Sequence, residues 1–180
     1  IYTGWEHGLD RGFSHYEDHR VSPGEIVYSA SLGRKVTGFP PLRRLIGYHQ
    51  ELGFKRAGDV NRELLRWLDR GPKRPFFAFL NLMDAHVPRI VAPPFDRRFG
   101  EPGRRALRNV IHVKHHAAIR GQARQSPAQL QADLDAYDGA IAYQDETLRD
   151  LMEALRQRGV LDDTLVIVTS DHGEHFGEHG

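Results

Sequence analysis

Residues 165–174, with the sequence LVIVTSDHGE, decide the predicted fold. Four apolar residues, 165–168, come directly before a cluster of metal-ligand side chains that begins with Asp171 and His172. A continuous apolar run of this length is typical of a strand covered on both faces of a parallel sheet. Open α/β sheets bind their ligands at the carboxyl ends of such strands. The stretch therefore predicts an α/β fold with a functional site just after this strand.

A helix and a second buried strand are predicted in the middle of the chain. Asp59 is the predicted N-cap of the helix, and Gly71 is its predicted stop. Residues 75–82, with the sequence PFFAFLNL, have the aromatic and aliphatic character of a strand that is covered on both faces. His86 follows this strand, so parallel strands would bring it to the same sheet edge as Asp171.

A long helix and a final strand complete the predicted layout. Ser126, Pro127 and Gln129 have the pattern of a capping box that starts a helix, and Gly159 is its predicted stop. The predicted core-facing stripe consists of Leu130, Leu134, Tyr137, Ile141, Leu148, Leu151, Met152 and Leu155. Residues 162–164 then turn the chain into the strand 165–169, which predicts a right-handed parallel crossover. We therefore expect a mostly parallel central sheet flanked by helices.

Composition is that of an ordinary globular protein. The chain has 180 residues, of which 39% are hydrophobic and 27% charged, so residues 1–180 are expected to belong to a single domain. The apolar stretches are strand-sized, which predicts no membrane segment in this piece, and a net charge of +1 argues against nucleic acid as a partner. The absence of Cys excludes disulfides and thiolate ligands within these residues. Because the sequence starts at Ile1 and ends within the ligand cluster, we expect a fragment whose localisation is cytoplasmic, periplasmic or secreted.

Residues 90–125 are rich in Pro and Gly, lack a regular period and are expected to form an insertion that faces the substrate. Within them, residues 97–124 carry many basic side chains and Glu101 as the sole acid. A solvated loop is favoured over contact with an anionic substrate or partner. The same preference for a solvated loop, over a second metal site, holds for His112, His115 and His116.

Asp171 and His172 are the candidate metal ligands. Adjacent strand residues point to opposite faces, so both side chains reach one ion only if the chain leaves the strand there, which Gly173 makes easy. A carboxylate with an imidazole suits Mn²⁺ or Zn²⁺, while Ca²⁺ normally prefers oxygen ligands. The alternative is that Asp171 caps a following helix and His172 is a polar loop residue.

The acidic and imidazole side chains of residues 174–179 are expected to be solvated or to support the ligands rather than bind the ion themselves. His172, Glu174 and His175 approach the zinc-protease arrangement His-x-x-Glu-His, but one intervening residue is missing, so that reading is rejected. His86 could hydrogen-bond an anionic oxygen or protonate a leaving group, with Asp84 or Asn81 orienting nearby groups. Its alternative is a structural loop histidine.

Several ordered motifs resemble the sulfatase family of the alkaline phosphatase superfamily. Residues 171–180, DHGEHFGEHG, resemble the family's signature, and residues 137–166 resemble the helix and strand that lead into it. Residues 75–88 resemble a second family motif, and residues 8–16 a segment ahead of that. The resemblance follows the chain in order and is weakest in residues 22–58 and 90–125.

The resemblance implies a metal-dependent hydrolase of sulfate esters with an alkaline-phosphatase-like fold. Asp171 and His172 become metal ligands, and His86 becomes the catalytic residue that contacts the sulfate or the leaving-group oxygen. The implied cofactors are a divalent ion, Ca²⁺ or Mn²⁺ more than Zn²⁺, and a formylglycine nucleophile on a missing upstream segment. The family's upstream Asp pair is also absent from these residues, so we expect the chain alone to be inactive.

Departures from the family pattern leave other activities open. Many sulfatases have Asn where His172 stands, and His at this place also occurs in relatives that cleave phosphonate or phosphate esters. Ala85 replaces a frequent Pro, and Arg89 replaces a frequent aromatic residue, changes expected to affect specificity more than mechanism. The alternatives are a phosphonate or phosphate ester hydrolase, a phosphoethanolamine transferase, or an inactive relative that binds anionic glycans.

Overall fold

The computed structural model falls into two compact units, Ile1–Lys55 and Arg56–Gly180. It describes residue 8 and residues 10–17, 55–71, 74–86, 89, 91, 93–100 and 126–176. In the first unit the described residues form a turn, in which the Arg11 N–H donates to the Gly8 carbonyl at 3.4 Å and the Phe13 N–H to that of Asp10 at 3.1 Å. Gly8 has a φ of +73°, a conformation that suits glycine.

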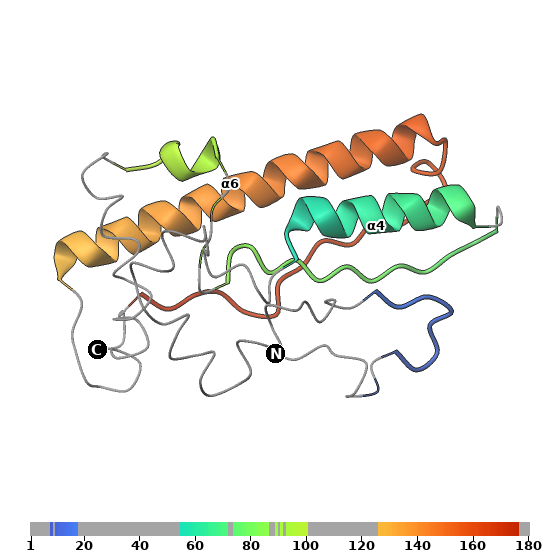
Figure 1. The fold of residues 1–180 in the computed structure, drawn as a ribbon, viewed down its shortest axis with the longest axis horizontal. Helices are drawn as coiled ribbons and strands as arrows, with labels where there is room; N and C mark the ends of the chain where they lie inside the picture. Colours follow the sequence, from blue (N-terminus) through green and yellow to red (C-terminus); the bar gives the residue numbers. More distant parts are fainter. Residues whose placement is uncertain are drawn as a thin grey trace, which may run out of the picture. The chain divides into compact units, whose positions relative to one another are not determined.

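Helix α4 in the second unit spans Ala57–Arg70 (Figure 1). Its predicted stop is confirmed, because Gly71 is the C-cap and its N–H donates to the Trp67 carbonyl. The predicted N-cap is wrong: the helix starts two residues before Asp59, which lies in the first turn and pairs with Arg62. A distant carboxylate replaces the local cap, since Asp84 Oδ2 accepts from the Ala57 N–H at 2.9 Å.

Helix α6 spans Pro127–Gln157 and begins at the predicted capping box. The Ser126 Oγ accepts from the Gln129 N–H at 3.3 Å, and the Gln129 side chain accepts from the Ser126 N–H at 3.0 Å. These two bonds satisfy donors that a helix start otherwise leaves unpaired. Gly159 has a φ of +67° just after the helix, so its predicted role as a stop is confirmed.

The buried face of α6 differs from the predicted stripe of large residues. Leu151 and Leu155 are buried as predicted, but Ile141 is 43% exposed. The first half buries small residues instead, namely Ala132, Ala136, Gly139 and Ala140. At Gly139 the reason is close approach by the short helix η2, Phe95–Arg97, because a Cβ added there would lie 2.9 Å from the Phe95 carbonyl oxygen.

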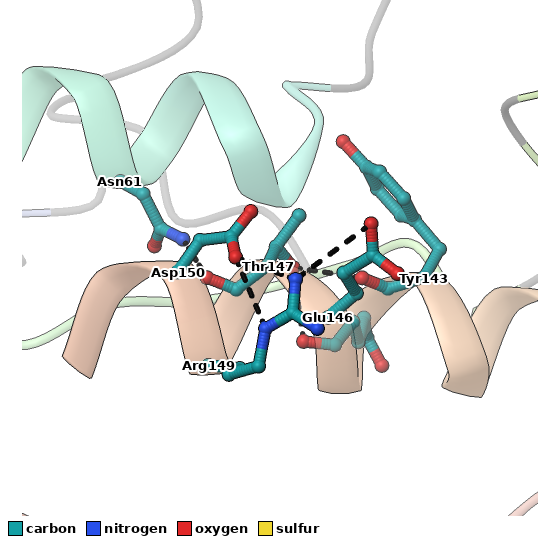
Figure 2. Close-up of polar contacts among 7 residues, drawn as sticks. Asn61, Tyr143, Glu146, Thr147, Arg149 and Asp150 are labelled. Carbon is teal, nitrogen blue, oxygen red and sulfur yellow. Dashed lines mark hydrogen bonds and ion pairs between the residues drawn. The ribbon is translucent and has the colours of Figure 1, made fainter. Parts of the chain in front are cut away.

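Polar contacts fasten α4 to α6. The Asn61 Nδ2 donates to the Thr147 carbonyl at 2.8 Å, a contact that Figure 2 shows between the two helices. Near the start of α4, the Gly58 N–H donates to the Tyr143 hydroxyl at 3.4 Å. The approach is close, because a Cβ added to Gly58 would lie 3.1 Å from that hydroxyl oxygen. The N-terminal half of α4 is thus held on the middle of α6.

The predicted strands are absent from the described residues. Residues 75–83 and 164–170 are extended or irregular segments that form neither helix nor strand (Figure 1). Many of their apolar residues are exposed, with Phe77 at 75% and Leu165 at 86%, where buried parallel strands were predicted. A strand exists only through hydrogen bonds to neighbouring strands, and the described part of the chain supplies none of these neighbours. The parallel crossover is likewise not formed there.

The turn predicted between α6 and residue 165 is present, since the Thr164 N–H donates to the Leu161 carbonyl at 3.0 Å. Of the predicted insertion, residues 101–125 lie outside the described residues, together with His112, His115, His116 and most of the basic side chains. Glu178 and His179 lie outside them too. None of the helices in the described residues combines the length and the apolar character of a membrane span.

Candidate functional site

A turn that ends at His86 forms the first part of the candidate site. The His86 N–H donates to the Met83 carbonyl at 3.0 Å and closes the turn. The buried carboxylate of Asp84 ties this turn to the first residue of α4. Burial raises the pKa of Asp84, and the hydrogen bond from Ala57 opposes this shift. Asp84 thus caps a helix, which differs from its expected role of orienting groups beside His86, and Asn81 is exposed.

A second turn, residues 170–173, carries the candidate metal ligands. The Ser170 hydroxyl donates to the His172 carbonyl, and the His172 N–H donates to Asp171 Oδ1 at 3.1 Å. The His172 Nδ1 lies 2.6 Å from the Gly173 carbonyl oxygen. This contact raises the pKa of His172, and the Asp171 carboxylate adds to the effect. The turn forms without a following helix in the described residues, so Asp171 does not cap one.

The two turns lie close together. The rings of His86 and His172 meet edge to face with centroids 6.5 Å apart, although 85 residues separate them in sequence (172 − 86 − 1). The sequence predicted that His86 and the Asp171–His172 pair would share one edge of the structure. Their proximity arises here through turns held by helices, not through adjacent strands.

The second turn presents donors that fit a divalent ion. A carbonyl oxygen can only accept, so the Nδ1 of His172 donates to Gly173 and the Nε2 of the neutral ring keeps its lone pair. This Nε2 lies 3.7 Å from Asp171 Oδ2, and both side chains are exposed. Within the described residues, however, no three candidate ligands gather. Asp171 and His172 alone would hold an ion weakly, so further ligands would be required.

The place of Arg89 in the candidate site was not predicted from the sequence. Its side chain is 2% exposed and binds two carboxylates, with Nη1 on Asp133 of α6 and Nη2 on Glu174 at 2.7 Å. Glu174, directly after the turn of the candidate ligands, therefore binds Arg89, and its expected support of those ligands stays a prediction. The available signal was Arg89 itself, a cation directly after the second motif where an aromatic residue is frequent.

Two aromatic rings complete the surroundings of Arg89. Its guanidinium carbon lies 5.1 Å from the ring centroid of Tyr137 and 4.9 Å from that of Phe176, and the two centroids are 5.3 Å apart. The guanidinium carbon and the two ring centroids thus form a nearly equilateral triangle, so the cation contacts both rings at once. Cation–π attraction of this kind strengthens when water is excluded.

Comparison with known families agrees with the resemblance seen in the motifs. The family model described as Sulfatase matches residues 8–180. Since this match covers nearly the whole chain, the chain belongs to the sulfatase family. The family implies an α/β fold of the alkaline phosphatase type, of which the described residues show the helices and not the sheet.

Two curated relatives are similar to parts of the chain. A choline-sulfatase from Rhizobium meliloti is 44% identical over 45 residues, which are 25% of this chain and 9% of the relative. A multifunctional alkaline phosphatase superfamily protein, PehA, from Trinickia caryophylli is 26% identical over 136 residues, which are 64% of this chain and 26% of the relative. The aligned residues thus span about a quarter or less of these relatives. No solved structure matches the chain.

Proposed function

We propose that this chain contributes part of the active site of a metal-dependent hydrolase of sulfate esters. The observation that carries the proposal is the meeting of His86 and His172, which join the two motifs that resemble the sulfatase family. Membership of that family and the similarity to a choline-sulfatase support the choice of a sulfate ester as the substrate class. Both relatives are much longer than their aligned parts, so the activity belongs to the full-length protein.

Each residue has a distinct proposed task. Asp171 and His172 hold a divalent ion, Ca²⁺ or Mn²⁺ more than Zn²⁺, together with ligands from outside the described residues. The bound ion supplies positive charge that stabilises the negative charge developing on the sulfuryl group. His86 contacts either the sulfate or the leaving-group oxygen. In the second case it donates a proton to the leaving-group oxygen as the bond between that oxygen and sulfur breaks. The nucleophile is proposed to be a formylglycine outside these residues, which contain no Cys/Ser-x-Pro-x-Arg sequence.

A second candidate is hydrolysis of phosphate or phosphonate esters, or transfer of phosphoethanolamine. The name of PehA describes a multifunctional member of the alkaline phosphatase superfamily, and its similarity covers more of this chain than that of the choline-sulfatase. The same residues could serve this chemistry, because the charge that develops on a phosphoryl group also needs a metal and a proton donor. The identity of the nucleophile separates the candidates: Cys or Ser in Cys/Ser-x-Pro-x-Arg favours sulfate, and Thr favours phosphoryl transfer.

A substrate series tests the proposal. The full-length protein, produced with its nucleophile matured and loaded in turn with Ca²⁺ and Mn²⁺, is assayed with 4-nitrophenyl sulfate, 4-nitrophenyl phosphate and a phenylphosphonate monoester. We expect the highest kcat/KM for the sulfate ester. A clear preference for a phosphorus ester would replace the proposal with the second candidate. Absence of turnover with all three esters and both ions would favour a relative that only binds anions.

A further inference from the structure

Arg89 joins three parts of the candidate site. It follows the turn that carries His86, it binds Asp133 on α6, and it binds Glu174 directly after the turn of Asp171 and His172. These partners lie 44 and 85 residues away in sequence. One buried side chain therefore connects the two turns to each other and to the longest helix.

The charge around Arg89 argues against a direct role in binding the substrate. Two carboxylates face one guanidinium, so the positive charge is already compensated and is not available to a sulfate group. The side chain is also 2% exposed, which closes it to an ester. Its remaining donor, Nε, is buried with no hydrogen-bond partner among the described residues. A buried arginine with two carboxylate partners is suited to fix the positions of those partners relative to each other.

The planar fork of the guanidinium group, with its two terminal nitrogens, explains why arginine suits this position. Its Nη1 and Nη2 reach two different carboxylates at once, while Tyr137 and Phe176 rest against the guanidinium. A lysine has a single point charge and cannot hold both partners in a fixed relative orientation. Phe176 is part of the same terminal segment as Glu174, so that segment is held by a charge and by a ring.

We propose that Arg89 is a positioning residue of the candidate site: by binding Asp133 and Glu174 together, it fixes the turn of Asp171 and His172 against the turn of His86. This inference rests on the proposed function for its catalytic consequence. Its structural content stands apart from the reaction, because it concerns the separation of the two turns, which the distance between the His86 and His172 rings measures.

Variants of the full-length protein test this role. Arg89→Met keeps the length of the side chain and removes both ion pairs, while Arg89→Lys keeps the charge and loses the fork. The matched control is Arg158→Met, because Arg158 also binds a carboxylate through two nitrogens, at 2.8 and 2.9 Å from Asp69, but on the exposed surface. The readouts are kcat and KM for the best ester of the series, the Kd for Mn²⁺, and a crystal structure of each variant.

Arg89→Met should lower kcat about 100-fold, because displacement of reacting groups by about 1 Å has an effect of that size. KM should change little, and the Kd for Mn²⁺ should rise about 10-fold, as for the loss of other groups that support metal ligands. Arg89→Lys should fall between Arg89→Met and the parent, and Arg158→Met should match the parent. The crystal structures should show the His86 and His172 rings farther apart in Arg89→Met than in the parent.

Unchanged kcat, metal affinity and ring separation in Arg89→Met would overturn the inference. If that variant does not fold, Arg89→Lys and Glu174→Gln provide the same comparison, since Glu174→Gln keeps the shape of the side chain and loses its charge. A parent protein that turns over no ester would defeat the proposed function alone. The ring separation would still decide whether Arg89 positions the two turns.

Discussion

The helices and the open segments of the second unit differ in where their contacts come from. Helix α6 begins at its own capping box and ends at its own glycine, so both termini are settled by neighbouring residues. Residues 164–170 expose Leu165 and Ile167, at 86% and 77%, and form no ladder within the described residues. A helix satisfies its backbone within one segment, whereas a strand depends on other segments.

The candidate site lies in the open segments rather than in the helices. The candidate ligands Asp171 and His172 lie in the open part, where local sequence does not settle the structure. Their turn is closed by hydrogen bonds among residues 170–173, and the pair of Glu174 with Arg89 joins it to distant parts of the chain. The helices act as the frame, because α4 holds the turn of His86 through Asp84 and α6 holds Arg89 through Asp133.

The largest expected loss of stability comes from breaking the frame's buried ion pair. Asp133→Ala removes a charge-assisted hydrogen bond from the buried Arg89, which keeps Glu174 as its remaining carboxylate, and loss of such a bond costs about 2 kcal/mol. Urea unfolding of the full-length protein measures this change in the free energy of unfolding. Asp69→Ala is the control, because its exposed pair with Arg158 should contribute nothing measurable. Equal stabilities of the two variants would show that the buried pair does not hold the frame together.

At Gly139, inside α6, helix propensity and packing against η2 predict effects of opposite sign on stability. Helix propensity alone predicts that Gly139→Ala stabilises a helix by about 1 kcal/mol. The added Cβ would lie 2.9 Å from the Phe95 carbonyl oxygen, and overpacking of this kind costs about 1–3 kcal/mol. We therefore expect net destabilisation of about 1 kcal/mol, again by urea unfolding. Ala128→Gly, at the exposed start of α6, calibrates the propensity effect. A more stable Gly139→Ala variant would mean that α6 and η2 do not pack this closely.

The smallest effect concerns pH. Burial raises the pKa of Asp84 above its ordinary 3.8, so the folded protein binds this proton more tightly than the unfolded chain does. The contribution of Asp84 to stability therefore increases as pH falls through the raised pKa, and decreases as pH rises through it. Asp84→Asn keeps an oxygen that can accept from Ala57 and cannot titrate. The free energy of unfolding of the parent, relative to that of this variant, should be higher at about pH 4 than at about pH 7. A difference that is independent of pH would argue against a buried carboxylate.

The sequence predicted the features that depend on neighbouring residues. Ser126 with Gln129, and the stops at Gly71 and Gly159, are local signals, and each is confirmed. The N-cap of α4 was predicted wrongly because its partner, Asp84, lies 27 residues away in sequence. The need for a small residue at Gly139 could not be predicted either, since it depends on how closely η2 approaches α6.

In the candidate site, too, features marked by neighbouring residues were predicted and those that depend on distant residues were not. His86, Asp171 and His172 were singled out because short motifs mark them, and the closeness of the two turns followed from their order in the predicted sheet. Arg89 was recognised as a departure from the family pattern, but its two carboxylate partners come from distant segments. A single sequence offers no signal for such pairs.

The most direct test of the central claim, that the two turns form one metal-dependent site, measures bound metal and ester turnover together in the full-length protein. Asp171→Asn should lose most of its bound metal and its turnover. His86→Asn should keep the metal and lose about 100-fold or more in kcat, the usual contribution of a proton donor. Retention of both metal and turnover in Asp171→Asn would contradict the claim.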